Sequence, residues 1–503
     1  MKIYSFLLAL VMSMMTVGLR AQDHSIWRQA RNAAGLGLDT TRQWGTAYFD
    51  ISHLEGDFHR VQEGGTTNAL KFKTERYMKI GKWFYGYGTF SFDDGRTKNR
   101  AYCDVLRPYN SDPYIFGSAE FGKYDFMDFD IDARLSTVRL GAFSYGVSVK
   151  YKNGDLSRLK DPRSRVNLCV YGISPSMTYT FLGKNTIGIG FEYVRRKEKL
   201  LSYSLVQTDA IFDFYDMSGL ENNSYSLGGH KGFQRQFVNH SLGGEVSYSY
   251  GGNSYSNLLT FAYLNEKEYI TEQYRRQPGR FYGERYEVGF QNRYRHGRLL
   301  HTLDFSLKIY SAYANEYLQK LSTTINPETG VESKEYSTAI VYEKRYTVDL
   351  SDLDASYKIA ILQGDSLQRA HFAVKFSKNT SENNHYVPES ALEYGGINIG
   401  GELGGNVLGG KLWSTIAVMH HTANNARLVL RNLSSPIAVN VLIPDMAWYS
   451  ADYNKFSAQI GFKMPVSVKG FSSDWFVKFY GDYLKSSDKR SLTFVGTSFG
   501  IIF

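Results

Sequence analysis

Apolar and polar residues alternate along most of this chain. From Leu303 to Ile309 the apolar side chains occupy every second position, and the stretch from Phe456 to Met464 repeats the pattern. A period of two places one set of side chains on each face of a β-strand. The pattern therefore predicts a chain built almost entirely of strands.

The alternating stretches predict about 18 strands, and a range of roughly 14–18 is compatible with the precision of strand boundaries read from a sequence. The expected strands are 45–60, 66–79, 82–94, 126–136, 138–152, 165–181, 185–198, 237–250, 256–270, 281–295, 299–315, 339–361, 369–378, 391–408, 411–423, 450–463, 474–485 and 490–503.

The connections between these strands differ in length in a regular way. Long connections, which follow odd-numbered strands, are expected at 95–125, 199–236, 316–338 and 424–449, whereas most connections after even-numbered strands are short. Alternation alone also fits a soluble β-sandwich. Short turns on one side, long loops on the other and charged residues on the polar face favour a transmembrane antiparallel up-and-down β-barrel with a polar lumen, an all-β fold.

The N-terminus has a different pattern. Residues 1–21 combine Lys2 with an apolar run and a small residue, Ala21, which is typical of a secretory signal peptide. Residues 22–44 include a short helical pattern that ends near Gly35. This segment is expected either to plug the barrel or to lead into it from the periplasm, and the barrel is expected to occupy residues 45–503.

Composition supports a barrel over a soluble secreted protein. The mean hydropathy of −0.36 is that of a soluble chain, yet 15% of residues are aromatic and Gly outnumbers Pro by 47 to 10. A membrane barrel spreads its apolar residues over alternating positions and carries aromatic girdles, so it needs no long apolar run. The net charge is +9. Cys103 and Cys169 either form one bridge or stay free.

The chain ends on an aromatic residue with apolar partners two and four places back: Phe503, Ile501 and Phe499. With the signal peptide and the alternating strands, this ending resembles the outer-membrane β-barrel proteins of Gram-negative, Bacteroidetes-like bacteria, many of which have no assigned role. The resemblance implies location in the cell outer membrane and contact with its lipids and lipopolysaccharide. It also implies that the barrel assembly machinery recognises the final strand.

A second resemblance lies near the N-terminus. The sequence Asn-Ala-Ala-Gly-Leu at 32–36 is similar to the Asn-Pro-Ala-Gly-Leu of the long-chain fatty-acid porin family, with Ala33 in place of the proline. In that family the N-terminal segment plugs a barrel of 14 strands.

Two motifs in the sequence match enzyme patterns only by spacing. Gly496–Gly500 matches the serine-hydrolase pattern G-x-S-x-G, but no His, Asp or Glu follows Ser498, as the order of that catalytic triad requires. Gly405–Lys411 has phosphate-loop spacing, but Leu412 stands where Ser or Thr must hold magnesium. We therefore expect no catalytic residue, no metal site and no cofactor.

Three carboxylates share one face of an expected strand: Asp128, Asp130 and Asp132. All three should face the lumen, with neighbours about 6–7 Å apart. They are expected either to form a cation path or divalent-ion site, or to pair with Lys or Arg of adjacent strands, such as Arg139 or Lys150.

Three arginines also share one face: Arg285, Arg293 and Arg295. As lumen residues they would bias a pore toward anions. Other arginines of the run 275–298 would bind lipopolysaccharide phosphates at the outer rim. The alternative is a solvated charged strand.

Together these patterns predict a channel or transport component, not an enzyme, for small solutes or hydrophobic ligands whose identity the sequence leaves unknown. One alternative is a barrel anchor whose extracellular loops bind partners or ligands. Another is a lipid-modifying enzyme embedded in the membrane. No nucleic-acid partner is expected.

Overall fold

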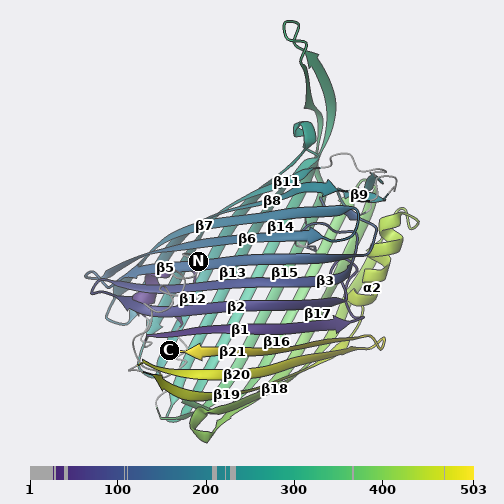
Figure 1. The fold of residues 1–503 in the computed structure, drawn as a ribbon. Helices are drawn as coiled ribbons and strands as arrows, with labels where there is room; N and C mark the ends of the chain where they lie inside the picture. The colour runs from purple at the N-terminus through teal and green to yellow at the C-terminus, as the bar shows by residue number, and fades with distance from the viewer. Residues whose placement is uncertain are drawn as a thin grey trace.

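The computed structural model describes residues 26–27, 30–38, 43–106, 108–109, 112–204, 206, 212–220, 223–226, 234–364, 367–468 and 471–503. The expected signal peptide therefore lies outside the described residues. Eighteen antiparallel strands form one closed barrel, because β1 pairs with β21 as well as with β2 (Figure 1). The strand number and the barrel fold expected from the sequence are confirmed.

The wall strands follow one another around the barrel in chain order. They are β1 (Trp44–Gly56), β2 (Thr66–Ile80), β3 (Phe84–Arg100), β5 (Gly122–Thr137), β6 (Phe143–Arg158), β7 (Arg163–Phe181), β8 (Asn185–Ser204), β11 (Arg235–Gly251), β12 (Tyr255–Glu272), β13 (Gly279–His296), β14 (Leu299–Ile325), β15 (Glu332–Gln363), β16 (Leu367–Tyr386), β17 (Glu389–Val407), β18 (Leu412–Val429), β19 (Tyr453–Val468), β20 (Phe471–Ser486) and β21 (Ser491–Ile502).

Short turns gather at one end of the barrel, which we call the short-turn end. Gly81, Gly183 and Gly297 each take a positive φ in these turns, at 60°, 72° and 58°. Glycine adopts this backbone conformation without a steric cost, so the chain reverses within a few residues. The opposite end, called the long-loop end, holds the longer connections. This asymmetry places the short-turn end in the periplasm.

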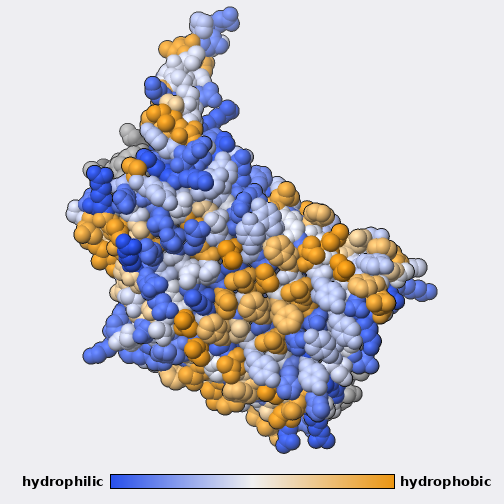
Figure 2. All heavy atoms as spheres, turned by 180° about the vertical axis from the view of Figure 1, so that it is seen from behind, coloured by the Kyte–Doolittle hydropathy of each residue, from blue (hydrophilic) through white to orange (hydrophobic). Residues whose placement is uncertain are grey.

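The outer surface of the barrel is apolar around its middle. Exposed side chains there include Leu242 at 64%, Phe372 at 47% and Ile416 at 63% of their full accessibility. Seen from behind, apolar side chains gather over the middle of the wall and hydrophilic ones near the base of a projecting hairpin (Figure 2). A closed barrel with an apolar belt satisfies its backbone hydrogen bonds while facing lipid. The protein is thus an outer-membrane β-barrel.

Three of the expected long loops contain structure of their own. The connection after β3 includes β4 (Phe116–Ser118), and that after β8 includes β9 (Phe214–Met217) and β10 (Asn223–Ser226). These three short strands form a separate sheet. The connection after β18 contains the π-helix η5 (Ala438–Leu442) and the helix α2 (Ile443–Tyr449). In the part of the chain that the structure describes, no helix is long and apolar enough to cross a membrane.

The expectation of a loop at 316–338 is wrong. These residues extend β14 and β15 into a two-stranded hairpin that projects beyond the rest of the barrel (Figure 1). The pairing continues from Glu316 opposite Tyr342 to Ile325 opposite Glu332. The hairpin persists because its backbone hydrogen bonds continue those of the wall, and Asn326 and Gly330 then reverse the chain.

Candidate functional site: the lumen between two inserted segments

The N-terminal segment lies inside the barrel near the short-turn end. Its helix η2 (Ala33–Leu38) buries Ala33, Ala34 and Leu36 almost completely. The Ser136 hydroxyl donates to the Ala34 carbonyl at 3.0 Å, and the Tyr77 hydroxyl donates to the Leu36 carbonyl at 3.1 Å. Inward-facing wall residues therefore hold the backbone of this segment inside the barrel.

Two glycines of the wall make room for this segment. A Cβ on Gly146 would lie 2.3 Å from the Ala34 nitrogen, and one on Gly188 would lie 2.6 Å from the Asn32 side-chain nitrogen. Real side chains do not approach other atoms so closely. Any larger residue at these two positions would displace the segment from the wall.

Arg31 joins the inserted segment to carboxylates of the wall. Its guanidinium pairs with Glu287 on β13 and lies 3.6 Å from Glu192 on β8. Glu245 on β11 lines the same space, and one of its carboxylate oxygens is buried without a hydrogen-bond partner. Three carboxylates therefore lie around Arg31, and one of them, Glu192, also pairs with Lys150 on β6 at 3.0 Å.

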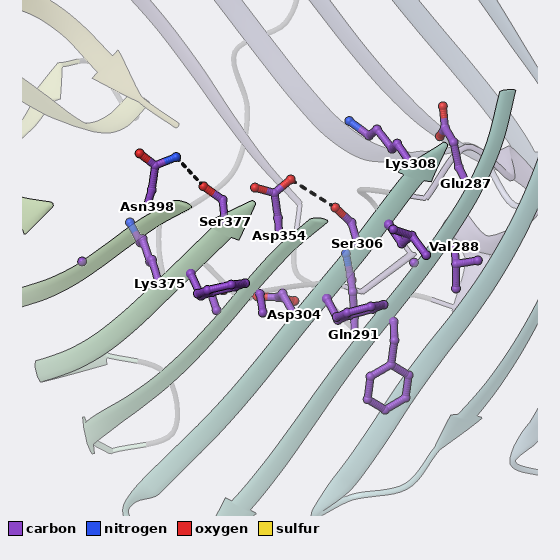
Figure 3. Close-up of a pocket in the computed structure, with 18 of the residues that line it drawn as sticks. Glu287, Val288, Gln291, Asp304, Ser306, Lys308, Asp354, Lys375, Ser377 and Asn398 are labelled. Carbon is purple, nitrogen blue, oxygen red and sulfur yellow. Dashed lines mark hydrogen bonds between the residues drawn. The ribbon is translucent and has the colours of Figure 1, made fainter. Parts of the chain in front are cut away.

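A cavity of about 640 Å³ opens beside Arg31 in the lumen. Figure 3 shows Lys308 close to Glu287 at one side and Lys375 with Asn398 at the other. Between them Ser306 donates to Asp354 at 3.4 Å, and Asn398 donates to Ser377 at 2.8 Å. Its charged lining side chains, four of each sign, are Arg31, Glu245, Glu287, Asp304, Lys308, Asp354, Lys375 and Lys455. The positive and negative side chains of the lining are therefore equal in number.

Inserted loops fill part of the lumen at the long-loop end. Phe116 of β4 and Phe214 of β9 pack against each other and against the inward-facing wall residue Phe237. Arg235, at the start of β11, is fully buried and pairs with Asp216 of β9 and with Glu272 of β12. A buried cation with two carboxylate partners fixes the small sheet to the wall, because separating them would leave charges unpaired in the interior.

The helix α2 holds the loops together through a buried carboxylate. Asp445 accepts hydrogen bonds from the Val61 backbone at 2.9 Å and from the Tyr109 hydroxyl at 2.6 Å. Burial raises the pKa of Asp445 to about 6. The contact therefore joins three separate loops and depends on the protonation of one group.

The three aspartates predicted on one face of β5 all lie on its inward face. Asp128 pairs with Lys152 of β6 at 3.1 Å, and Asp132 pairs with Arg134 at 2.8 Å. Asp130 stands opposite Lys152 in the register of β5 and β6. Lys150 pairs with Glu192 instead. Among the residues that the structure describes, no cluster of three His, Cys, Asp or Glu could hold a metal ion.

The three arginines predicted on one face of β13 also point inward, with Arg285 eight residues from Arg293 and Arg293 two residues from Arg295. The Arg285 guanidinium lies 5.3 Å from the Tyr310 ring. Arg295 lies near the short-turn end, where its Nε donates to the Gly297 carbonyl at 3.4 Å. Arg293 stands opposite Thr302, between the other two. They are spread along the pore instead of forming a ring around it.

The last strand closes the wall. Phe499 is outward and 47% exposed, with its ring 5.6 Å from Trp475, and Ile501 stands opposite Trp475. The Phe503 backbone exchanges hydrogen bonds with Gly45 on β1. Ser498 is buried and donates to Asp50 at 2.5 Å, so the serine motif belongs to a wall contact.

Sequence reasoning missed the carboxylates around Arg31 and the inserted loops. Alternation alone assigns Glu245 and Glu287 to inward faces, because each has an outward apolar residue beside it in the chain, Val246 and Tyr286 respectively. Alternation does not predict the register between β8, β11 and β13, and it is this register that brings the carboxylates together. The thiols of Cys103, buried among the inserted loops, and Cys169, on β7, are both free.

Searches of known proteins return matches of low similarity. No curated protein matches the chain. The outer membrane transporter YddB from Escherichia coli shares 8% identity at a TM-score of 0.41, with 91% of this chain and 81% of that chain covered. The FrpB iron transporter from Neisseria meningitidis shares 9% identity at a TM-score of 0.40, with 93% and 83% covered. The outer membrane protein opdK from Pseudomonas aeruginosa shares 11% identity at a TM-score of 0.35, with 92% and 99% covered.

TM-scores of 0.41 or lower and identities of 11% or lower carry no information about a substrate of this protein. A family model matches residues 33–503, from the inserted segment to the C-terminus. The chain belongs to this family, which is described as a family of unknown function (DUF6850).

Proposed function

We propose that the protein is an outer-membrane channel, or a transport component, for small polar solutes. The observation that carries the proposal is the lumen cavity of about 640 Å³, lined by charged side chains of both signs and bordered by the inserted N-terminal segment. Its volume lies within the range of about 300–1,000 Å³ that is usual for small-molecule sites. The charged lining favours polar solutes over the hydrophobic ligands also considered from the sequence.

In this proposal Arg31 is the residue that restricts passage. Its guanidinium holds the inserted segment to Glu287 and Glu192, so a solute passes more readily when that contact opens. Removal of Arg31 takes one positive charge away from the three carboxylates of the site, and fixed charges that line a pore set its ion preference.

Conductance of the purified protein in planar bilayers tests this proposal. We expect Arg31→Ala and a deletion of residues 22–38 to raise conductance severalfold over wild type. Arg31→Ala should also shift the reversal potential in a potassium chloride gradient toward cation preference. Arg165→Ala is the matched control, because Arg165 lies on the outward face of β7 and pairs with Asp155.

An absence of conductance and of liposome swelling in wild type and in both variants would contradict the channel. That result would favour the second candidate, an anchor whose outer parts bind other molecules. The projecting hairpin supports this candidate, since Leu318, Ile325 and Val341 are exposed on it at 47%, 64% and 48%. A two-stranded hairpin without further packing is marginally stable in water, and a bound partner would stabilise it.

A further inference from the structure

Basic residues gather on the outward face of the wall just above the apolar belt. Arg195 on β8 stands opposite His240 on β11, which stands opposite Lys267 on β12. These paired residues form one row across the strands. A second row of outward residues lies one step nearer the long-loop end; it begins with Lys197 on β8 and ends with Arg280 on β13. Four cations, Arg195, Lys197, Lys267 and Arg280, thus lie on β8, β12 and β13 within two adjacent rows.

These side chains point away from the lumen. Phe191 and Leu242 have the same strand parity as Arg195 and His240, and they are 66% and 64% exposed. The alternating positions Glu198 and Glu268 face inward and are buried. The four cations therefore face the membrane surroundings.

Their height along the barrel corresponds to the outer surface of the membrane. Arg195 is ten residues beyond Asn185, where β8 leaves the short-turn end. At about 3.3 Å per residue and a tilt of about 40°, this corresponds to about 25 Å, the height of the apolar band of such barrels. Arg195 and Lys267 thus lie where the acyl chains of the outer leaflet end and its headgroups begin.

The neighbours of these cations are tyrosine rings. The Arg195 guanidinium lies 5.7 Å from the Tyr171 ring, the Lys267 nitrogen 5.3 Å from that of Tyr282, and the Arg280 guanidinium 4.9 Å from that of Tyr269. Within the described residues, no carboxylate forms an ion pair with any of the four, and the buried Nε of Arg280 has no hydrogen-bond partner. By contrast, Arg165 on β7 pairs with Asp155 at 2.9 Å.

We propose that Arg195, Lys197, Lys267 and Arg280 form a binding site for the phosphate groups of an outer-leaflet glycolipid. Guanidinium and ammonium groups without carboxylate partners suit phosphate oxygens, and the exposed apolar residues below suit acyl chains. The cations extend from β8 across β11 to β12 and β13, which is about 14 Å at the spacing of adjacent strands. A single phosphodiester headgroup is too small for this span, whereas a sugar headgroup with two phosphates matches it.

Native mass spectrometry of the full protein in detergent micelles, with bisphosphorylated lipid A added, tests the site. We expect Arg195→Ala/Lys197→Ala/Lys267→Ala to weaken lipid A binding by about tenfold or more. Lys378→Ala is the matched control: Lys378 is an exposed, outward cation on β16 that stands between Leu353 and Ile397. This control should bind lipid A as wild type does.

Two measurements on the unaltered protein accompany the variants, so the test remains decisive if the triple variant fails to fold. Molar salt should weaken lipid A binding, because exposed charge contacts are screened. Lipid A stripped of both phosphates and phosphatidylglycerol should each bind more weakly than lipid A. Equal binding of either lipid, or wild-type binding by a folded triple variant, would overturn the proposal.

Discussion

At the scale of single residues, charges that face the lumen are paired in ways that depend on register. Lys150 stands opposite Asp132 but pairs with Glu192 on β8, and Lys152 stands opposite Asp130 but pairs with Asp128. Alternation in the sequence predicts that all of these side chains share the lumen. It does not predict which of them meet, because a shift of two residues between neighbouring strands keeps each face and changes every partner.

Ser498 is a residue whose role follows from its contacts. Its hydroxyl donates to Asp50, which also accepts a hydrogen bond from the Tyr480 hydroxyl at 2.7 Å. We expect Ser498→Ala to lower the free energy of unfolding by about 1–2 kcal/mol, because one hydrogen bond to a charged group is lost. Conductance should stay at the wild-type level.

The temperature at which the faster-migrating folded band is lost on gels measures this change in stability. Tyr480→Phe is the matched control, because it removes the other hydrogen bond to Asp50. Loss of function by Ser498→Ala in a barrel of wild-type stability would show that the serine has a functional role after all.

At the scale of elements, the strands were predictable and the inserted segments were not. Each wall strand presents lipid on one face and a polar lumen on the other, so two-residue alternation marks it directly. The residues around Phe116 and Phe214 bury their side chains inside the barrel against Phe237, and nothing periodic in their sequence reports that partner. The same holds for the N-terminal segment, whose position depends on space left by Gly146 and Gly188.

The docking of α2 should depend on pH. Burial raises the pKa of Asp445 from its ordinary value of 3.8 to about 6, so the docked helix binds the proton more tightly than the released one. Docking is therefore strongest below pH 3.8 and weakens as pH rises to about 6, by about 3 kcal/mol at most. Above that range it should be constant.

Hydrogen–deuterium exchange of residues 436–450, corrected for intrinsic rates, measures this docking. Asp445→Asn keeps an acceptor for the Val61 amide but has no carboxyl to titrate, so protection should become independent of pH between 4 and 7. The same pH trend in Asp445→Asn as in wild type would assign the titration to a different group.

At the scale of the whole molecule, the barrel is complete only when its last strand pairs with its first. The Phe503 amide donates to the Gly45 carbonyl at 2.9 Å, and the Phe503 ring lies 5.0 Å from the Arg76 guanidinium. The aromatic ending was visible in the sequence because it is a local signal. The pairing with β1 was implied only by an even strand number.

We expect deletion of Phe503 to lower the amount of folded barrel in the outer membrane severalfold. Phe503→Ala separates two causes, because it keeps the backbone hydrogen bonds to Gly45 and removes only the ring. A loss in both variants would indicate that the assembly machinery requires the aromatic side chain. The heat-modifiable band of membrane fractions measures the folded amount, and wild-type amounts for the deletion would contradict the expectation.

The pairing of β1 with β21 can form only after the whole chain has been made. Thr46 stands opposite Ile502, so the seam joins the first strand to leave the ribosome with the last. Until β21 arrives, the open edge of β1 has no permanent neighbour, and exposed strand edges attract other chains. The open edge of β1 therefore needs protection from other chains until the seam closes.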